Sequence, residues 1–169
     1  MIINTVLIIL IAICVFTDLS KRKIYNKVLF PAAIIALTYH IYTAGISGGF
    51  FSVKGLFIGT ALLLIPYFMG GIGAGDVKFL GVIGAFKGCN FIFVTFLAGA
   101  IAGGIMAVFC LFKNKKMLFI FKKLLAPFLI RHGFILNNTE NDETININCT
   151  IPYSAAIAVG AAAAAYFVR

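Results

Sequence analysis

Residues 69–79 read MGGIGAGDVKF and place one acid, Asp76, directly after four glycines in six residues. The surrounding chain of 169 residues is 62% hydrophobic and 11% charged, and it contains only five acidic residues. Three of these lie within residues 140–143, so that only Asp18 and Asp76 stand among apolar sequence. Because ionised groups are costly in apolar surroundings, we interpret these two aspartates as a functional pair.

The composition is that of an integral membrane protein. The mean hydropathy is +1.08, and several uncharged runs reach the ~18–20 residues that cross a ~30 Å hydrocarbon core as a helix. We therefore predict an all-α, polytopic bundle of about six transmembrane helices, in a single membrane-embedded domain over residues 1–169. The expected helices are residues 1–17, 28–51, 55–69, 76–86, 88–112 and 151–168.

The fourth expected helix is short, since only 11 residues run from Asp76 to Phe86, before Lys87. At ~1.5 Å per residue they reach about 16 Å, roughly half a bilayer. If Lys87 marks the outer surface, Asp76 lies below the cytosolic surface. Water must then reach it through a cavity, because irregular glycine-rich backbone is not tolerated against lipid.

The one long polar stretch is residues 113–150, which we expect to be a cytosolic loop. Within it, residues 117–131 mix Leu and Phe with Lys and Arg, a pattern that favours an interfacial amphipathic helix. The asparagine-rich remainder is expected to be a flexible loop.

The net charge of +9 is interpreted as a membrane topology signal, because the cations fall between the apolar runs. We therefore expect no nucleic-acid partner. In the six-helix arrangement, 11 of the 14 Lys and Arg residues share one side with Asp18 and Asp76. The positive-inside rule makes this side cytosolic and places both termini outside. The cations left on the outer side are Lys54, Lys87 and Arg169.

No cofactor is expected. The four cysteines lack CxxC spacing and are read as small buried hydrophobes, and no zinc or nucleotide motif is present.

The two aspartates suit acid–base chemistry. Asp18 ends the first expected helix and Asp76 begins the fourth, so both carboxyl groups can lie at one level of the membrane. Two carboxylates held close in low dielectric cannot both ionise cheaply, and such a pair activates water and protonates an amide leaving group. The structural alternatives are that Asp76 is only a helix N-cap and that Asp18 only pairs with the cations at residues 21–23.

The motifs resemble those of the type IV prepilin peptidases, which are membrane aspartyl proteases of the glycine-x-glycine-aspartate kind. Gly73-Ala74-Gly75-Asp76-Val77-Lys78 is similar to the second catalytic motif of that family. Asp18 with Ile24-Tyr25-Asn26 is similar to the first, in which many relatives have Ile-Pro-Asn. Residues 151–153, Ile-Pro-Tyr, resemble the start of the family's last helix.

The resemblance implies roles for particular residues. Asp18 and Asp76 would be catalytic. A second set would bind substrate or support the loop: Gly70, Gly71, Gly73, Gly75, Lys78 and Asn26. Taken alone, Lys78 is also consistent with a lysine at the membrane interface whose side chain snorkels toward water.

The implied activity is cleavage of a short basic leader from type IV prepilin-like or pseudopilin precursors at the cytosolic face of the cell membrane. Only nine residues separate Asp18 from Val28, so the cysteine-rich insertion of longer relatives is absent. A peptidase without N-methyltransferase activity is therefore expected, with the methylation question left open.

Two alternatives belong to other functional classes. An ion- or proton-coupled transporter would use Asp18 and Asp76 as a relay and would need acids near the middle of the bilayer. A structural subunit of a secretion apparatus would need neither aspartate.

Overall fold

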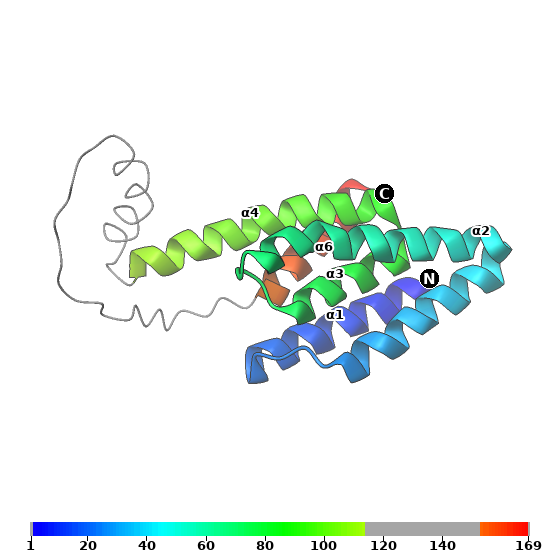
Figure 1. Cartoon of the computed structure of the whole chain (residues 1–169), viewed down its shortest axis with the longest axis horizontal. Coiled ribbons are helices and arrows are strands. Elements are labelled where there is room, and N and C mark those ends of the chain that lie inside the picture. The colour runs from blue at the N-terminus through cyan, green and yellow to red at the C-terminus, as the bar shows by residue number, and fades with distance from the viewer. Residues whose placement is uncertain (1, 114–152, 169) are drawn as a thin grey trace. The chain divides into compact units, whose positions relative to one another are not determined.

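The computed structural model describes residues 2–113 and 153–168, and each regular element among them is a helix. The all-α prediction is therefore confirmed for these residues (Figure 1). The expected amphipathic helix at residues 117–131, like nearly all of the predicted polar loop, lies outside the described residues. The helices are α1 (Ile2–Lys21), α2 (Asn26–Phe68), α3 (Ala74–Lys87), α4 (Cys89–Lys113) and α6 (Tyr153–Phe167).

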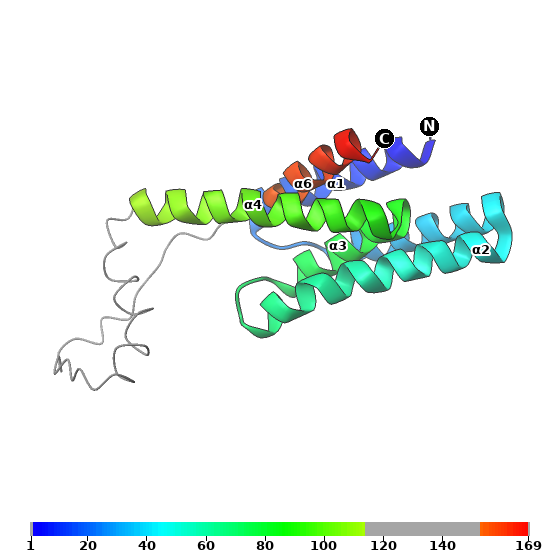
Figure 2. The ribbon, with the colours of Figure 1, turned by 90° about the horizontal axis from the view of Figure 1, so that it is seen from above.

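The predicted number of six helices is not confirmed, since five are present among the described residues. The second and third expected spans, residues 28–51 and 55–69, fall almost entirely within α2, which consists of two helical arms on either side of a kink at Gly45 rather than of helices divided near residues 51–55. Within α2, Gly45 has non-helical backbone angles, φ 62° and ψ −145°. There the helix turns back, so that its two arms run side by side (Figures 1 and 2).

Glycine makes this turn possible. A positive φ strains most side chains but not glycine. Close to the turn, a Cβ on Gly48 would lie 2.0 Å from the backbone oxygen of His40, so the two arms approach at a distance that only glycine allows.

Three described helices are long and apolar enough to cross a membrane: Ile3–Lys21 in α1, Asn26–Phe68 in α2 and Cys89–Phe109 in α4. Helices α3 and α6 have 14 and 15 residues. At ~1.5 Å per residue, neither reaches the ~30 Å of a hydrocarbon core. Large apolar side chains on the long helices are exposed, as a lipid-facing surface requires, among them Phe16, Tyr42 and Phe109.

The described residues belong to two compact units, Met1–Gly103 with Pro152–Arg169, and Gly104–Ile151. Of the second unit, the structure describes only the end of α4. Each feature discussed below lies in the first unit.

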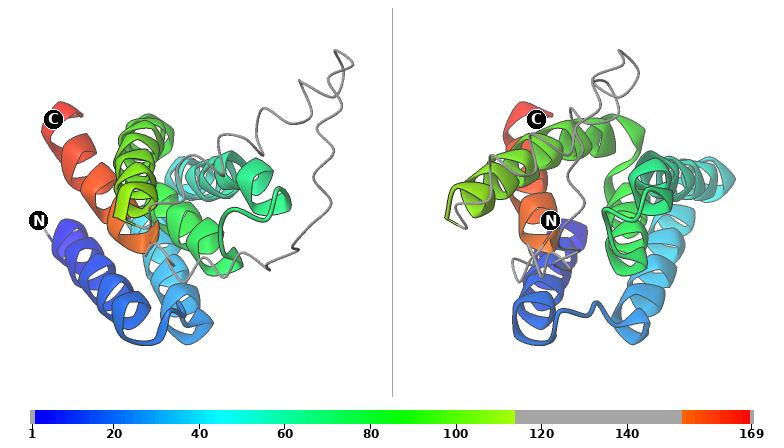
Figure 3. Two further views of the ribbon diagram at one scale, coloured as in Figure 1. Left: turned by 90° about the vertical axis from the view of Figure 1, so that its left-hand side faces the viewer. Right: turned by 60° about the vertical axis from the view of Figure 1, so that its left-hand side comes forward.

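The short helix α3 forms the buried centre of the first unit. It packs against α1, α2 and α6 (Figure 3), and the side chains of Phe79, Leu80 and Ile83 are at most 1% exposed. The contact with α2 depends on small residues, since a Cβ on Gly55 would lie 2.0 Å from the backbone oxygen of Gly84. Close backbone approach of this kind favours helix association in membranes, and here it fixes α3 against α2 near the C-terminal end of α3.

Candidate active site

Asp18 and Asp76 lie on different helices, and their carboxyl groups interact electrostatically. Asp18 is in the last turn of α1, and Asp76 is in the first turn of α3. Burial raises the pKa of Asp76 from 3.8 to about 6, the negative charge of Asp18 adds to this increase, and the backbone N–H of Gly73 partly offsets it. The fold therefore brings together two carboxyl groups that are far apart in the sequence.

One oxygen of the Asp76 carboxyl group lacks a hydrogen-bond partner among the described residues. This atom, Oδ1, is buried. A buried acceptor without a partner costs about 1–3 kcal/mol, and protonation reduces the cost of a buried carboxylate. Asp76 also lies outside the three candidate membrane spans. This group is therefore suited to carrying a proton near neutral pH.

The Asp18 carboxylate has a specific donor. The hydroxyl of Ser154, at the start of α6, donates a hydrogen bond to Asp18 Oδ2. Ser154 is fully buried, whereas Asp18 is half-buried. The N-terminus of α6 carries partial positive charge, which favours a nearby anion and counteracts the unfavourable position of Asp18 at the C-terminal end of α1.

Ser154 is a site residue that reasoning from the sequence missed. The signal was present, because a hydroxyl residue follows Ile-Pro-Tyr at the start of the last apolar run. The same turn of α6 contributes Tyr153, whose phenol pKa is raised by burial and then by the charge of Asp76. Two consecutive residues of α6 therefore lie near the two aspartates, Ser154 at Asp18 and Tyr153 at Asp76.

Gly70 and Gly71 shape the chain between α2 and α3. Gly70 has φ +76°, a conformation that favours glycine. The N–H of Gly70 donates to Tyr67 O at 2.9 Å, and the N–H of Gly71 donates to Pro66 O at 3.1 Å. Both residues are exposed. These hydrogen bonds terminate α2, and neither of them involves Asp18 or Asp76.

Gly73 and Gly75 lie closer to the carboxyl groups. Gly73 is the N-cap of α3, and its carbonyl accepts the Asp76 N–H at 3.1 Å. A Cβ on Gly75 would lie 3.0 Å from Cβ of Ile24, which belongs to the link between α1 and α2. Because Gly75 lacks a side chain, this link packs directly against the start of α3, which helps to bring Asp18 to Asp76.

Lys78 and Asn26 connect the two motifs. Lys78 Nζ donates to Asn26 Oδ1 at 3.1 Å, and the ammonium group lies 5.9 Å from the centre of the Phe30 ring. Both Lys78 and Asn26 are exposed. The contact ties the start of α2 to α3, two residues along α3 from Asp76.

Within residues 2–113 and 153–168, no group of three His, Cys, Asp or Glu residues could hold a metal ion. The groups that these residues bring to the site are two carboxyls, the Ser154 hydroxyl, the Tyr153 phenol and glycine backbone. Such a set can hold and transfer protons.

Comparison with known proteins adds one finding. A family model described as the type IV leader peptidase family matches residues 5–108. The matched range contains Asp18, Asn26, the glycine-rich motif and Lys78, whereas α6 with Ser154 lies beyond it. No curated protein and no solved structure matches this chain.

Proposed function

Because the chain belongs to the type IV leader peptidase family, we propose that it is an aspartic endopeptidase that removes the short basic leader from prepilin-like or pseudopilin precursors. The observation that carries this proposal is the pairing of Asp18 and Asp76, in which each carboxyl group has a different environment. A peptidase of this kind needs one ionised and one protonated carboxyl group.

The environments suggest which aspartate plays which role. Asp18, which accepts the Ser154 hydrogen bond beside the N-terminus of α6, acts as the general base. Asp76, with its raised pKa, acts as the general acid.

In the proposed reaction, Asp18 takes a proton from water as the water oxygen bonds to the scissile carbonyl carbon. Asp76 then gives its proton to the amide nitrogen as the C–N bond breaks. Transfer of the proton from Asp18 to Asp76 restores the starting state, so that neither a metal nor a redox partner is consumed.

The substrate would approach along the glycine-rich chain. Backbone at residues 70–75 carries little side-chain bulk, so an extended scissile segment can lie against it and form main-chain hydrogen bonds. The buried, unpartnered Oδ1 of Asp76 would gain a partner from the bound water or the scissile carbonyl. The distribution of Lys and Arg supports a cytosolic position for this site and outer positions for both termini.

The test is to co-express a precursor with the full chain and to measure the precursor mass. We expect the mature mass with the wild type, and the full precursor mass with Asp18→Asn or Asp76→Asn, both of which keep side-chain volume. Lys54→Gln, on the exposed surface of α2, serves as the control. Continued processing by either aspartate variant, at normal membrane abundance, would exclude the proposed mechanism. It would also reopen the alternatives of a transporter or a structural subunit.

A further inference from the structure

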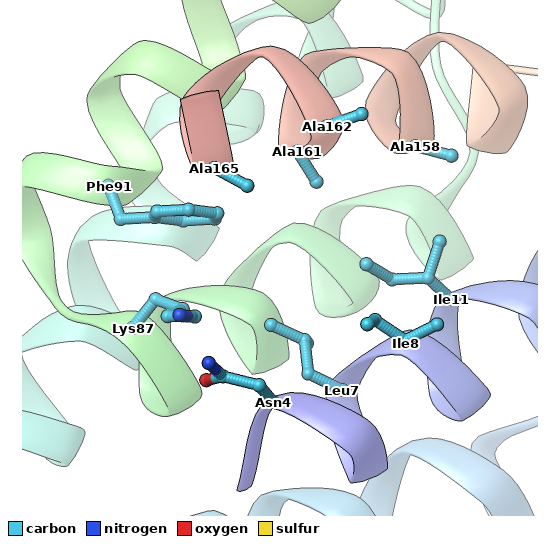
Figure 4. Close-up of a pocket in the computed structure, with 10 residues that line it drawn as sticks. All are labelled: Asn4, Leu7, Ile8, Ile11, Lys87, Phe91, Ala158, Ala161, Ala162 and Ala165. Atoms are coloured by element: carbon cyan, nitrogen blue, oxygen red, sulfur yellow. The ribbon is translucent and has the colours of Figure 1, made fainter. Parts of the chain in front are cut away.

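A separate cavity lies toward the other end of α1 from Asp18. It has a volume of about 450 Å³ and opens between α1, α6, the end of α3 and the start of α4 (Figure 4). Eight of its ten lining residues are apolar, including Leu7 and Ile11 of α1 and Ala161 and Ala165 of α6. We call this cavity the α1–α6 groove.

The two polar lining residues of the groove, Lys87 and Asn4, lie together at one end of it (Figure 4). Lys87 is half-buried, and its ammonium group lies 5.4 Å from the centre of the Phe91 ring. Neither of the two acids that the structure describes, Asp18 and Asp76, is at this end of the groove. A cation and an amide donor therefore lie at one end of the otherwise apolar α1–α6 groove.

This distribution matches an amphiphile with an anionic head. A phosphate would accept hydrogen bonds from the Lys87 ammonium and the Asn4 amide, and charge-assisted bonds of this type are the strong ones. An acyl chain would cover the apolar walls. The volume falls within the ~300–1,000 Å³ of typical small-ligand sites.

The volume of the groove also favours an acyl chain over a peptide helix as its occupant. An α-helix is ~10–12 Å across and rises ~1.5 Å per residue, so a space of about 450 Å³ holds only about three or four residues of helix. A purely apolar helix would also supply no counterion for the Lys87 charge. Size and charge therefore both favour a lipid.

We propose that the α1–α6 groove binds one anionic phospholipid, with its phosphate at Lys87 and Asn4 and an acyl chain between α1 and α6. The site is distinct from the aspartate pair and does not depend on the proposed peptidase activity. The bound lipid would stabilise the packing of α1 against α6, the two helices that also carry Asp18 and Ser154.

The test uses the delipidated full chain in detergent, titrated with phosphatidylglycerol or with zwitterionic phosphatidylcholine. Native mass spectrometry counts the retained lipid, and thermal unfolding measures stabilisation. We expect one retained phosphatidylglycerol, with a preference over phosphatidylcholine of about tenfold, which corresponds to ~1.4 kcal/mol. The same lipid should raise the unfolding temperature.

Three variants locate the site. Lys87→Gln should remove the preference for phosphatidylglycerol, and Ala165→Leu, which fills the groove without changing charge, should reduce retention of both lipids. Lys54→Gln removes an exposed cation outside the groove and should bind as the wild type does. Asn4→Leu gives a second test of the head-group end if Lys87→Gln unfolds.

Equal retention of phosphatidylglycerol by the wild type and by both groove variants would overturn the proposal. So would an equal loss in Lys54→Gln, because binding would then follow surface charge alone. Displacement of the lipid by an apolar transmembrane peptide, with no effect of Lys87→Gln, would make a helix the occupant instead.

Discussion

The Ser154 hydroxyl of α6 donates a hydrogen bond to the Asp18 carboxylate of α1, across 136 positions of the sequence. This contact adds a third helix to a site otherwise built by α1 and α3. A buried hydroxyl that donates to one carboxylate makes the two aspartates unequal, because only Asp18 receives this stabilisation. In the proposed mechanism, this difference decides which carboxyl group keeps the proton.

Ser154→Ala is expected to lower kcat about 10–100-fold, since a hydrogen bond to a charged group contributes roughly 1.5–3 kcal/mol. KM should change little, because Ser154 acts on Asp18 rather than on the substrate. Ser154→Thr keeps the hydroxyl and should restore most of the activity. Steady-state kinetics on a purified precursor would check this, and equal losses in the Ala and Thr variants would contradict a positioning role.

Asp76→Asn is expected to abolish cleavage and yet to stabilise the fold at neutral pH. The native pKa of about 6 lies above the ordinary 3.8, so the native state binds more protons between these values and stability falls as pH rises through them. Removing the charge should therefore add at most about 3 kcal/mol above pH ~6. Thermal unfolding in detergent measures this gain.

The gain should vanish below pH ~3.8, where Asp76 is protonated in both states. The same variant at low pH is thus its own control. A variant that is less stable than the wild type at neutral pH would show that the Asp76 charge is favourable in the fold.

The pH dependence of kcat/KM tests the assignment of the general acid. Since the proposed mechanism requires Asp76 to be protonated in the free enzyme, kcat/KM should fall as pH rises through about 6. Enzyme held at each pH and then assayed near pH ~6 would separate this titration from loss of fold. A kcat/KM that rises through the same range would reverse the roles of Asp18 and Asp76.

Gly75→Val is expected to impair activity through packing, because a Cβ added at this position would lie only 3.0 Å from Cβ of Ile24. The branched side chain would push the link between α1 and α2 away from α3, and Asp18 would move with it. Ile24→Ala should partly rescue Gly75→Val, with a coupling of about 0.5–3 kcal/mol.

Gly104→Val in α4, outside the candidate site, is the matched control, since a Cβ there would meet nothing within 4 Å. The measurement is the cleavage activity of each variant on the same precursor, compared at equal membrane abundance. Full activity of Gly75→Val would show that the contact with Ile24 does not position Asp18.

The class of this protein and its candidate chemistry could be predicted from the amino-acid sequence alone. Composition and uncharged run lengths are local properties, so they predict membrane helices without knowledge of the fold. Asp18 and Asp76 could be selected as a pair for the same reason, because an acid in apolar sequence is conspicuous wherever it folds. The glycines before Asp76 likewise predict irregular backbone at that point.

The features that depend on residues far apart in the sequence became visible in the folded structure. Positive φ at Gly45 interrupts the helix inside the expected span 28–51 and turns the chain back, and run length cannot place that turn. The Ser154 contact and the high pKa of Asp76 arise from packing between α1, α3 and α6. So does the α1–α6 groove beside Lys87. Burial and electrostatic coupling act between residues that the fold brings together, and local sequence patterns do not record them.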